Sequence, residues 1–412
     1  MTTTNFPISW VRQSFPALND GETFVFFDNG AGAQVPQTVL DAVRNHLVRH
    51  NVQRGGRYRK SQEVDATIQK ARESVAVFLN AREAAEVAFG MNATSFIRIV
   101  SLALAEILGE RKEIIVTDLD HEANVATWLA LQGRGAVIRW WKMREDGTLR
   151  VEDLAPLLSP HTRLVACAVA SNALGTIVDV KQVAQLAHAA GAEVFLDAVH
   201  YAPHGVIDVQ HWDCDYLVCS GYKIFAPHMG FLWGKRELLE RLPTFREDFI
   251  PDQVPTKIEV GTFVYENVAG MDAAIGYLEE LGRKVNPGAG SRREQIVFAM
   301  EAIRAYETEL SAETLHSLSK LQNARIYGIQ DQLTNRVPTI CFNIDGKSPA
   351  LVASHCSDNG VGVRDGNMYS PRLLGRMGIA PDTGAVRASL VHYNTHDEIH
   401  RFTEVLRELT NA

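Results

Sequence analysis

The stretch DYLVCSGYKIFAPHMGFLWG (215–234) indicates both the fold class of this chain and a chemically unusual position within it. It contains two short apolar runs, YLVCS (216–220) and GFLWG (230–234), and one lysine, Lys223, between them. Short apolar runs bounded by glycine and turn residues are typical of strands buried on both faces of a sheet. An ammonium group among such residues loses its hydration, so it requires a partner, neutralisation or a chemical role.

Five similar apolar runs precede this stretch, and helix-like segments separate several of them. The runs are EVAFG (86–90), EIIVTD (113–118), AVIRWW (136–141), RLVACAVAS (163–171) and EVFLD (193–197). Helical patterns cover 95–108, 123–133 and 180–191. Strands that alternate with helices predict an α/β domain with a mainly parallel, seven-stranded sheet.

The turn-rich, basic segment RKVNPGAGSRR (283–293) marks the expected domain boundary. After it come a long helical pattern to about Leu321, a strand near TICFNI (339–344) and a C-terminal helix from about Thr395. We therefore expect a large domain over 21–285 and a smaller α+β C-terminal domain over 286–412. An N-terminal segment, 1–20, is expected to pack with the smaller domain.

The composition excludes several classes of function. A net charge of −8 gives no basic surface for nucleic acid, and no apolar run approaches the roughly 20 residues of a membrane span. The first residues, MTTTNFPISWVRQ, lack the pattern of a secretory signal. The five cysteines lie mostly in apolar runs, which is typical of reduced core cysteines in a cytoplasmic protein.

Function in such folds concentrates in loops after the carboxyl ends of strands, and two of these loops contain polar residues. MNATS, after 86–90, places Ala93 and Thr94 at a helix start, where they cap the helix or offer amides to a phosphate. LDHEAN, after 113–118, contains His121 among acidic residues. It fits a metal site, a histidine stacked on an aromatic ligand, or an acidic surface turn. The lack of H-x-x-x-H or C-x-x-C spacing counts against a metal.

Two charged residues end later strands. Asp197 closes EVFLD, where a carboxylate either meets a ligand or caps a turn. Lys223 follows the strand YLVCS, where a lysine either serves as a nucleophile or extends its side chain to the surface. In an apolar setting the pKa of a lysine falls, and the neutral amine attacks carbonyl groups. Pyridoxal 5'-phosphate (PLP) requires a lysine amine for a Schiff base, a carboxylate at its ring nitrogen and a site for its phosphate. The loops offer these groups together with a histidine that could stack on the ring.

The motifs of the chain resemble those of fold type I PLP enzymes of aminotransferase class V, specifically the branch of cysteine desulfurases and selenocysteine lyases. The resemblance extends from FFDNGAGAQVP (26–36) to VRASLVHYNT (386–395). SGYKIFAPHMGFLWG is similar to the family block S-G-H-K-x-x-G-P-x-G. By this likeness Lys223 carries the Schiff base with the cofactor, Ser220 contacts its phosphate, and Tyr222 replaces a histidine that binds the phosphate.

Three further motifs imply the remaining cofactor contacts within the chain. LDAVHYAPHG resembles D-x-A-Q, so Asp197 would face the pyridinium nitrogen and His200 the ring hydroxyl. DHEAN resembles E-H-x-A-N, so His121 would stack on the ring. NATS resembles G-[AT]-T-E, so Ala93 and Thr94 would bind the phosphate.

Other motifs imply substrate contacts and a second subunit. ASNALGT resembles S-N-x-x-G, which places Asn172 near the ring and the substrate carboxylate. IEVGTFVYEN resembles E-x-G-T-P, in which Thr262 reaches the phosphate of the neighbouring subunit, so a homodimer with shared active sites is implied. Arg387 in VRASL stands where the family binds the substrate α-carboxylate, although alone it would be interpreted as a surface arginine. NVQRGGRYRKS (51–61) resembles N-V-H-R-G-x-H, with Arg57 or Arg59 available for a second anionic group.

The chain departs from the family at the catalytic cysteine. Desulfurases carry it in a loop R-x-G-x-x-C-A-x-P, whereas VRDGNMYSPRLL (363–374) has Tyr369 there. A phenol cannot take a persulfide sulfur, so we expect an enzyme that binds an α-amino acid as an external aldimine and cleaves a C–S or C–C bond at Cβ. Lys223 would transfer the Cα proton, and Tyr369 would protonate the leaving group or only pack. The alternatives are an aminotransferase or epimerase and, in a different class, a non-catalytic or metal-binding α/β protein.

Overall fold

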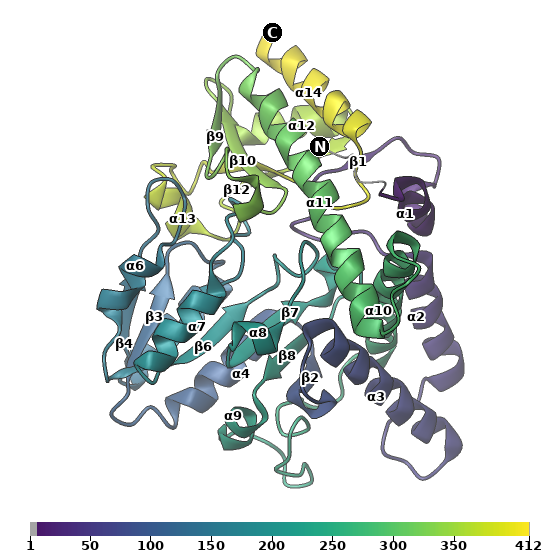
Figure 1. Cartoon of the computed structure of the whole chain (residues 1–412), viewed down its shortest axis with the longest axis vertical. Helices are drawn as coiled ribbons and strands as arrows, with labels where there is room; N and C mark the ends of the chain where they lie inside the picture. Colours follow the sequence, from purple (N-terminus) through teal and green to yellow (C-terminus); the bar gives the residue numbers. More distant parts are fainter. Residues whose placement is uncertain (1–5, 412) are drawn as a thin grey trace.

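The computed structural model describes residues 6–411, and a seven-stranded sheet forms the centre of its larger part (Figure 1). The strand order is β2-β8-β7-β6-β5-β3-β4, and neighbours are parallel except that β8 is antiparallel to β7 and β2. The strands are β2 (Val87–Gly90), β3 (Glu113–Thr117), β4 (Val137–Trp141), β5 (Thr162–Ala168), β6 (Glu193–Asp197), β7 (Tyr216–Ser220) and β8 (Gly230–Gly234). The prediction that the seven apolar runs form one mainly parallel sheet is confirmed.

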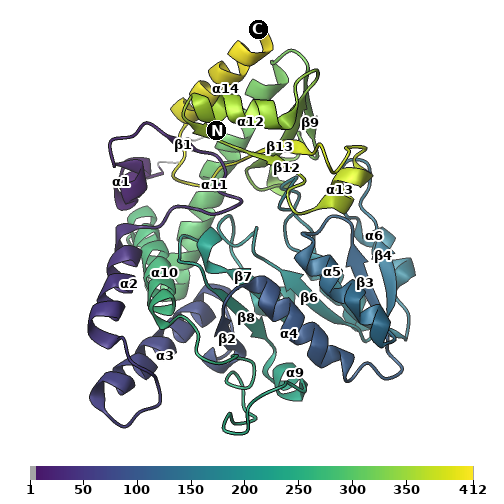
Figure 2. The same ribbon diagram turned by 180° about the vertical axis from the view of Figure 1, so that it is seen from behind.

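Alternate side chains of this sheet pack into two separate cores. In β6, Val194 and Leu196 belong to one core, and Phe195 belongs to the other. Helix α4 (Ala93–Ala105) covers the face of Phe195 (Figure 2), and α7 (Val180–Ala189) covers the opposite face (Figure 1). Burial on both faces explains why these strands are apolar throughout.

A second, wholly antiparallel sheet has the order β12-β13-β10-β9 and lies at the upper end of the molecule in Figure 1. Its strands are β9 (Ala324–Tyr327), β10 (Thr339–Ile344), β12 (Arg364–Gly366) and β13 (Ala385–Ser389). Helices α12 (Pro349–Asp358) and α14 (His396–Asn411) pack near this sheet. The strand at 339–344 and the C-terminal helix therefore lie where the sequence predicts them.

Two long helices meet at the turn-rich segment of the expected boundary. Helix α10 (Tyr265–Val285) ends there, and α11 (Arg292–Ser319) begins just after it. The start of α11 is fixed by a capping box, because Ser291 Oγ accepts a hydrogen bond from Glu294 N and the Glu294 carboxylate accepts one from Ser291 N. Helix α11 extends from the large sheet to the small one (Figure 1). The division of the chain between residues 285 and 286 stays a prediction.

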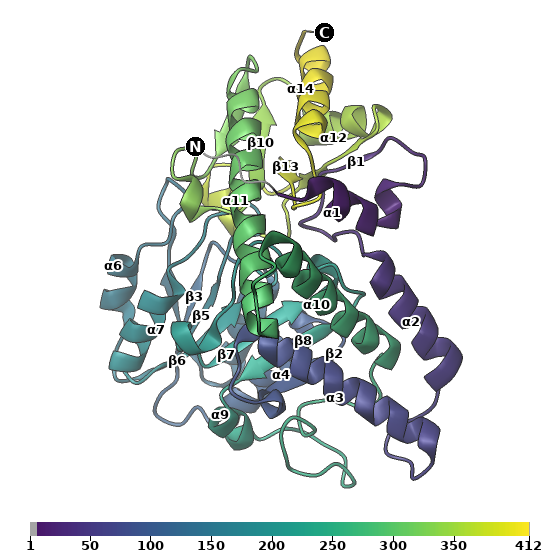
Figure 3. The ribbon, with the colours of Figure 1, turned by 45° about the vertical axis from the view of Figure 1, so that its right-hand side comes forward.

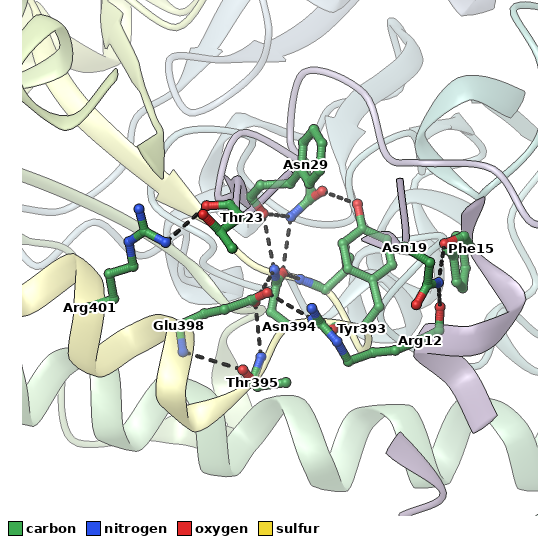
Figure 4. A network of polar contacts seen from close by, with 12 residues as sticks. Arg12, Phe15, Asn19, Thr23, Asn29, Tyr393, Asn394, Thr395, Glu398 and Arg401 are labelled. Atoms are coloured by element: carbon green, nitrogen blue, oxygen red, sulfur yellow. Dashed lines mark hydrogen bonds and ion pairs between the residues drawn. The ribbon is translucent and has the colours of Figure 1, made fainter. Parts of the chain in front are cut away.

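The N-terminal helix α1 (Ile8–Ser14) contacts the C-terminal part of the chain (Figure 4). Arg12 Nη1 donates hydrogen bonds to the carbonyl of Tyr393 and to Glu398 Oε1, both at 2.8 Å. The aromatic ring of Phe6 also packs close to this region. Residues 1–5 of the predicted 1–20 segment lie outside the described residues, and the extent of the segment stays a prediction.

The remaining elements surround these two sheets. Helices α2 (Gln37–His50) and α3 (Arg59–Leu79) lie against α10 (Figure 3). Strand β1 (Val25–Phe26) pairs in parallel with β11 (Val361–Gly362). The short helices are α5 (Ala123–Leu129), α6 (Val151–Leu154), α8 (Val209–Trp212), α9 (Arg236–Arg241) and α13 (Pro371–Arg376). Within residues 6–411, no helix has the length and apolar composition to cross a membrane.

Candidate active site

One cavity lies where strands β5, β6 and β7 end, beside the start of α4. It contains about 460 Å³ of free space, including the part that is open to solvent. All but one of the residues with a predicted cofactor contact line the cavity: Ala93, Thr94, His121, Asn172, Asp197, His200, Ser220, Tyr222 and Lys223.

Lys223 lies in the short 3-10 helix Gly221–Lys223 directly after β7, and it is only 7% exposed. Its Nζ lies 5.9 Å from the centre of the Tyr222 ring and makes no hydrogen bond or ion pair within residues 6–411. Burial, followed by the charge of Arg387, lowers the pKa of Lys223 to about 8. The alternative of a lysine that extends to the surface is therefore wrong.

The N-terminus of α4 forms one end of the cavity. Asn92 caps this helix by accepting a hydrogen bond from Ser95 N at 2.9 Å, and Ser220 Oγ accepts one from Ala93 N at 3.2 Å. Gly230 allows the close approach, because a Cβ at that position would lie 2.6 Å from the Cα of Asn92. The free amides and the positive end of the helix dipole make this end of the cavity suited to a phosphate.

A carboxylate and an imidazole lie deeper in the cavity. Asp197 is the last residue of β6, its Oδ1 accepts a hydrogen bond from Val199 N at 2.9 Å, and burial raises its pKa. His200 Nε2 lies 2.8 Å from Thr339 Oγ1, and burial lowers the pKa of His200 well below its usual value. The cavity therefore places a buried carboxyl group near a neutral histidine.

The loop LDHEAN is folded inward. Asp118 and Asp120 are buried, so the interpretation as an acidic surface turn is wrong. Asp120 accepts a hydrogen bond from Asn124 Nδ2 at 2.7 Å, and burial raises the pKa of Asp120 to about 7. His121 Nδ1 accepts a hydrogen bond from Ala123 N at 3.1 Å, and burial lowers the pKa of His121 to about 4. The described part of the chain places no group of three or more His, Cys, Asp or Glu side chains to bind a metal.

The segment around Tyr369 is fixed at one edge of the cavity. Asn172 Nδ2 donates to the Met368 carbonyl at 2.6 Å, and Glu122 N donates to the Tyr369 carbonyl at 2.8 Å. Met368 and Tyr369 have φ angles of 54° and 57°, a left-handed conformation that costs energy for residues other than glycine. The Tyr369 ring lies 5.6 Å from the ring of His121. Tyr369 itself lines a neighbouring cavity rather than the main one.

Arg387, on β13, is buried with only 2% of its surface exposed, so the interpretation as a surface arginine is wrong. Its Nη1 donates to the Asn172 carbonyl at 2.8 Å, and its Nη2 donates to Asp28 Oδ1 at 3.0 Å. Arg387 does not line the main cavity, but Asn172 does. The sequence reasoning missed Asp28; the available signal was a carboxylate directly after the apolar run FVFF (24–27).

Three further predicted site residues, in addition to Tyr369 and Arg387, lie outside this cavity. Thr262 lies on an exposed segment and accepts a hydrogen bond from Gln53 Nε2 at 3.0 Å. Arg57 is exposed, and Arg59 Nη1 lies 3.6 Å from Glu63 Oε1. One chain therefore does not bring these three residues together with the others.

All five cysteines are buried and unpaired. Burial raises the pKa of each thiol: Cys167, Cys214, Cys219, Cys341 and Cys356. A protonated, buried thiol is an inert nucleophile, and none of the five lines the cavity. The cytoplasmic location inferred from these cysteines stays a prediction.

The donor set of the cavity fits PLP. The unpaired, buried amine of Lys223 is free to meet an aldehyde, and the buried Asp197 carboxyl group suits a pyridine nitrogen. The start of α4 and Ser220 suit a phosphate, and the neutral ring of His121 suits stacking on the cofactor ring.

Comparisons with known proteins agree with this donor set. The family model "Aminotransferase class-V" matches residues 25–402. A probable cysteine desulfurase of Synechocystis sp. is 34% identical over 96% of this chain and 94% of its own length. The aminotransferase-like protein FGM3 of Gibberella zeae is 33% identical over 98% of this chain and 99% of its own length. The apo structure of a cysteine desulfurase from Thermococcus onnurineus NA1 has a TM-score of 0.88 at 26% identity, with 100% of both chains covered.

The family match extends over most of the chain, and the relatives exceed 30% identity over nearly its whole length. Members of the class-V family use PLP, and the cavity contains the groups that PLP requires. The chain therefore belongs to the class-V aminotransferase family and is a PLP-dependent enzyme of fold type I.

Proposed function

We propose that this enzyme is a lyase that cleaves a C–S or C–C bond at Cβ of an α-amino acid without forming a persulfide on the protein. Relatives that are named cysteine desulfurases support an α-amino acid as the substrate class. The proposal depends on Tyr369, whose ring lies 5.6 Å from the His121 ring, while every cysteine is buried away from the cavity. A phenol does not accept a sulfur atom, so the leaving group departs to solvent or to a second substrate.

The residues of the cavity have distinct roles in this proposal. When bound, PLP supplies an electron sink for the negative charge that develops at Cα. The Lys223 amine removes the proton from Cα and later returns a proton. The Asp197 carboxylate keeps a proton on the ring nitrogen, and the His121 ring packs on the cofactor. Arg387 binds the α-carboxylate and thereby orients the Cα–H bond toward Lys223.

Product analysis tests this proposal. Incubation with L-cysteine and other amino acids that carry an anionic leaving group at Cβ is expected to release that anion together with a 2-oxo acid and ammonia. Alanine is expected only from a substrate whose group leaves Cβ without the bonding electron pair, such as carbon dioxide from a β-carboxylate. Mass spectrometry of the protein is expected to find no persulfide. Transfer of the amino group to a 2-oxo acid would indicate an aminotransferase, and a D-amino acid would indicate an epimerase. A persulfide on any cysteine would overturn the proposal.

The Tyr369→Phe variant is expected to reduce kcat about 100-fold for substrates with poor leaving groups, because a positioned proton donor contributes about 10²–10⁴-fold. Binding of PLP should not change, since Tyr369 does not line the main cavity. Steady-state kinetics with a series of leaving groups measures this effect. The control is Tyr58→Phe at another exposed tyrosine; an equal loss for all leaving groups would show that Tyr369 only packs.

Uptake of PLP by the cofactor-free enzyme is expected to accelerate with pH. Burial lowers the pKa of Lys223 to about 8, so the amine is mostly charged at pH 7 and mostly neutral at pH 9. Only the neutral amine attacks an aldehyde, so the rate should rise about tenfold as the neutral fraction increases from about 0.09 at pH 7 to about 0.9 at pH 9. Stopped-flow absorbance measures this rate; a constant rate between these two pH values contradicts the expectation.

A homodimer with shared active sites is also part of the proposal. Thr262 and the arginines of the 51–61 segment lie outside the cavity of their own chain, which suits residues that complete the site of a partner. Large apolar side chains are exposed on α2 and on the segment 245–264: Leu40, Leu47, Val48, Phe245, Phe249, Val260 and Val264. Burying these side chains against a second copy would stabilise the dimer.

Mixed dimers test the shared site. Lys223→Ala and Thr262→Ala each inactivate or weaken a homodimer, because each site then lacks one contribution. A heterodimer of the two variants should recover one intact site and about half of the wild-type activity per dimer, as expected for intersubunit complementation. Analytical ultracentrifugation measures the oligomeric state of each sample. A monomer, or a mixture with no recovery of activity, contradicts the shared site.

A further inference from the structure

Asp28 binds two arginines at once. Arg364 Nε donates to Asp28 Oδ2 at 2.8 Å, and Arg364 Nη2 forms an ion pair with the same oxygen at 2.7 Å. Arg387 Nη2 donates to Asp28 Oδ1 at 3.0 Å. Arg364 and Arg387 are directly opposite each other on the antiparallel strands β12 and β13. Like charges in this position destabilise a sheet, so Asp28 supplies the negative charge that allows both arginines to lie there.

The backbone next to Asp28 is fixed by a network that Figure 4 shows. Asn29 Nδ2 donates to the Ser389 carbonyl at 2.9 Å and to Asn394 Oδ1 at 3.1 Å, and the Tyr393 hydroxyl donates to Asn29 Oδ1. These contacts join the segment after β1 to β13 and to the residues that precede α14. The hydrogen bonds of Asn29 therefore hold the backbone next to Asp28 in place.

The two arginines differ in their surroundings. Arg387 is buried, and its Nε has no hydrogen-bond partner among the described residues. The side chain of Arg364 is 36% exposed and lines two cavities, one of which also contains Asp28 and Tyr222 of the main site. The cluster of Asp28, Arg364 and Arg387 has a net charge of +1 and one unused, buried donor. One further carboxylate would neutralise its charge.

We propose that Asp28 is an internal counter-ion that orients Arg387 before substrate binds, and that Arg364 retains Asp28 when a substrate carboxylate replaces it on Arg387. This inference rests on the proposed function, in which Arg387 binds the α-carboxylate. Both contacts of Arg364, one hydrogen bond and one ion pair, are made to Oδ2, so Oδ1 is able to leave Arg387 without breaking them. Asp28 and Arg364 are thus positioning residues that set the affinity for the amino acid.

The affinity of the holoenzyme for L-alanine tests this coupling, with the change of the visible absorption band as the signal. Arg364→Gln should raise the half-saturating concentration about tenfold, because Asp28 then competes more strongly for Arg387. In the Asp28→Asn background, the same substitution should change this concentration less than about twofold, since no competing carboxylate remains. An equal effect in both backgrounds would overturn the inference, because Arg364 would then act on the substrate directly.

Melting temperatures of the cofactor-free protein give a second measurement that needs no substrate. Arg364→Gln should lower the melting temperature of the wild type but raise that of Asp28→Asn, where it removes unscreened repulsion between two arginines. Arg325→Gln, in strand β9 of the same sheet, is the control. It should shift the melting temperature in the same direction in the wild type and in Asp28→Asn. A shift of the same sign for Arg364→Gln in both backgrounds overturns the inference alone. In another outcome, the melting-temperature shift reverses its sign as expected, but no amino acid changes the visible absorption band of the holoenzyme. That outcome overturns the proposed function, and with it the role of Asp28 toward a substrate.

Discussion

The Lys223→Ala variant is expected to lose the visible absorption band of the holoenzyme and to turn over amino acids at least about 10³-fold more slowly than the wild type. Among residues 6–411, Lys223 is the one lysine that lines the main cavity, so its removal would delete both the proposed attachment point of PLP and the proposed carrier of the Cα proton. The cofactor-free variant should also melt at a higher temperature near pH 7. At pH 7 the folded wild type carries a buried ammonium group on Lys223, because its pKa of about 8 lies above that pH. The unfolded chain solvates this charge, so the charge destabilises the folded wild type, and alanine removes that cost.

Two controls separate this role from a structural one. Lys320→Ala removes a lysine at the exposed end of α11 and should leave the band, the turnover and the melting temperature unchanged. Methylamine added to Lys223→Ala should restore part of the turnover, because a free amine replaces the missing proton carrier. Retention of the band and of more than about a tenth of wild-type turnover by Lys223→Ala would refute the assignment.

The Arg387→Leu variant is expected to raise KM for α-amino acids about 30-fold or more, because loss of a buried, charge-assisted contact costs about 2–5 kcal/mol. PLP should still bind with its usual absorption band, since Arg387 does not line the main cavity. Leucine leaves Asp28 paired with Arg364, so the carboxylate does not become an isolated buried charge. Amino-acid titrations of the band and steady-state kinetics measure the effect.

The conservative Arg387→Lys variant should recover only part of the lost affinity, because a lysine keeps the charge but not the paired donors of a guanidinium. Arg325→Leu, in the same small sheet, should leave KM unchanged. The Arg387→Leu substitution is expected to weaken the binding of propionate, which has a carboxylate, but not of amines that have none. If it weakens both kinds of analogue equally little, Arg387 does not bind the carboxylate. A loss of the absorption band in Arg387→Leu would instead point to a role in cofactor binding.

The sequence was sufficient to predict the parts of the site that follow strands. Asp197 and Lys223 close β6 and the turn after β7, and the apolar runs that identify those strands are buried on both faces. Adjacent parallel strands end at the same edge of a sheet, so residues at their ends meet even when they are far apart in the chain. This rule explains why His121, after β3, also lines the same cavity.

Residues whose position depends on tertiary contacts could not be predicted in this way. Asp28 follows an apolar run, but only the pairing of β12 with β13 brings two arginines to it. The backbone of Met368 and Tyr369 is left-handed, and Asn172 and Glu122 from distant parts of the chain donate hydrogen bonds to their carbonyls. The spacing of residues in the sequence therefore predicts which residues lie at the ends of strands. It does not predict which distant residues are brought into contact when the strands pair.

The network around Asn29 also has a consequence for the biosynthesis of the enzyme. The side chains of Asn29 and Asn394 are 365 positions apart in the chain, and Asp28 and Arg387 are 359 apart. The residues that line the cofactor cavity, 93–223, leave the ribosome well before Arg387 does, and chains fold from the N-terminal end as they emerge. The cluster of Asp28 and Arg387 therefore cannot form until β13 has emerged, and a ribosome that stops before β13 produces a chain without the arginine that would bind the substrate.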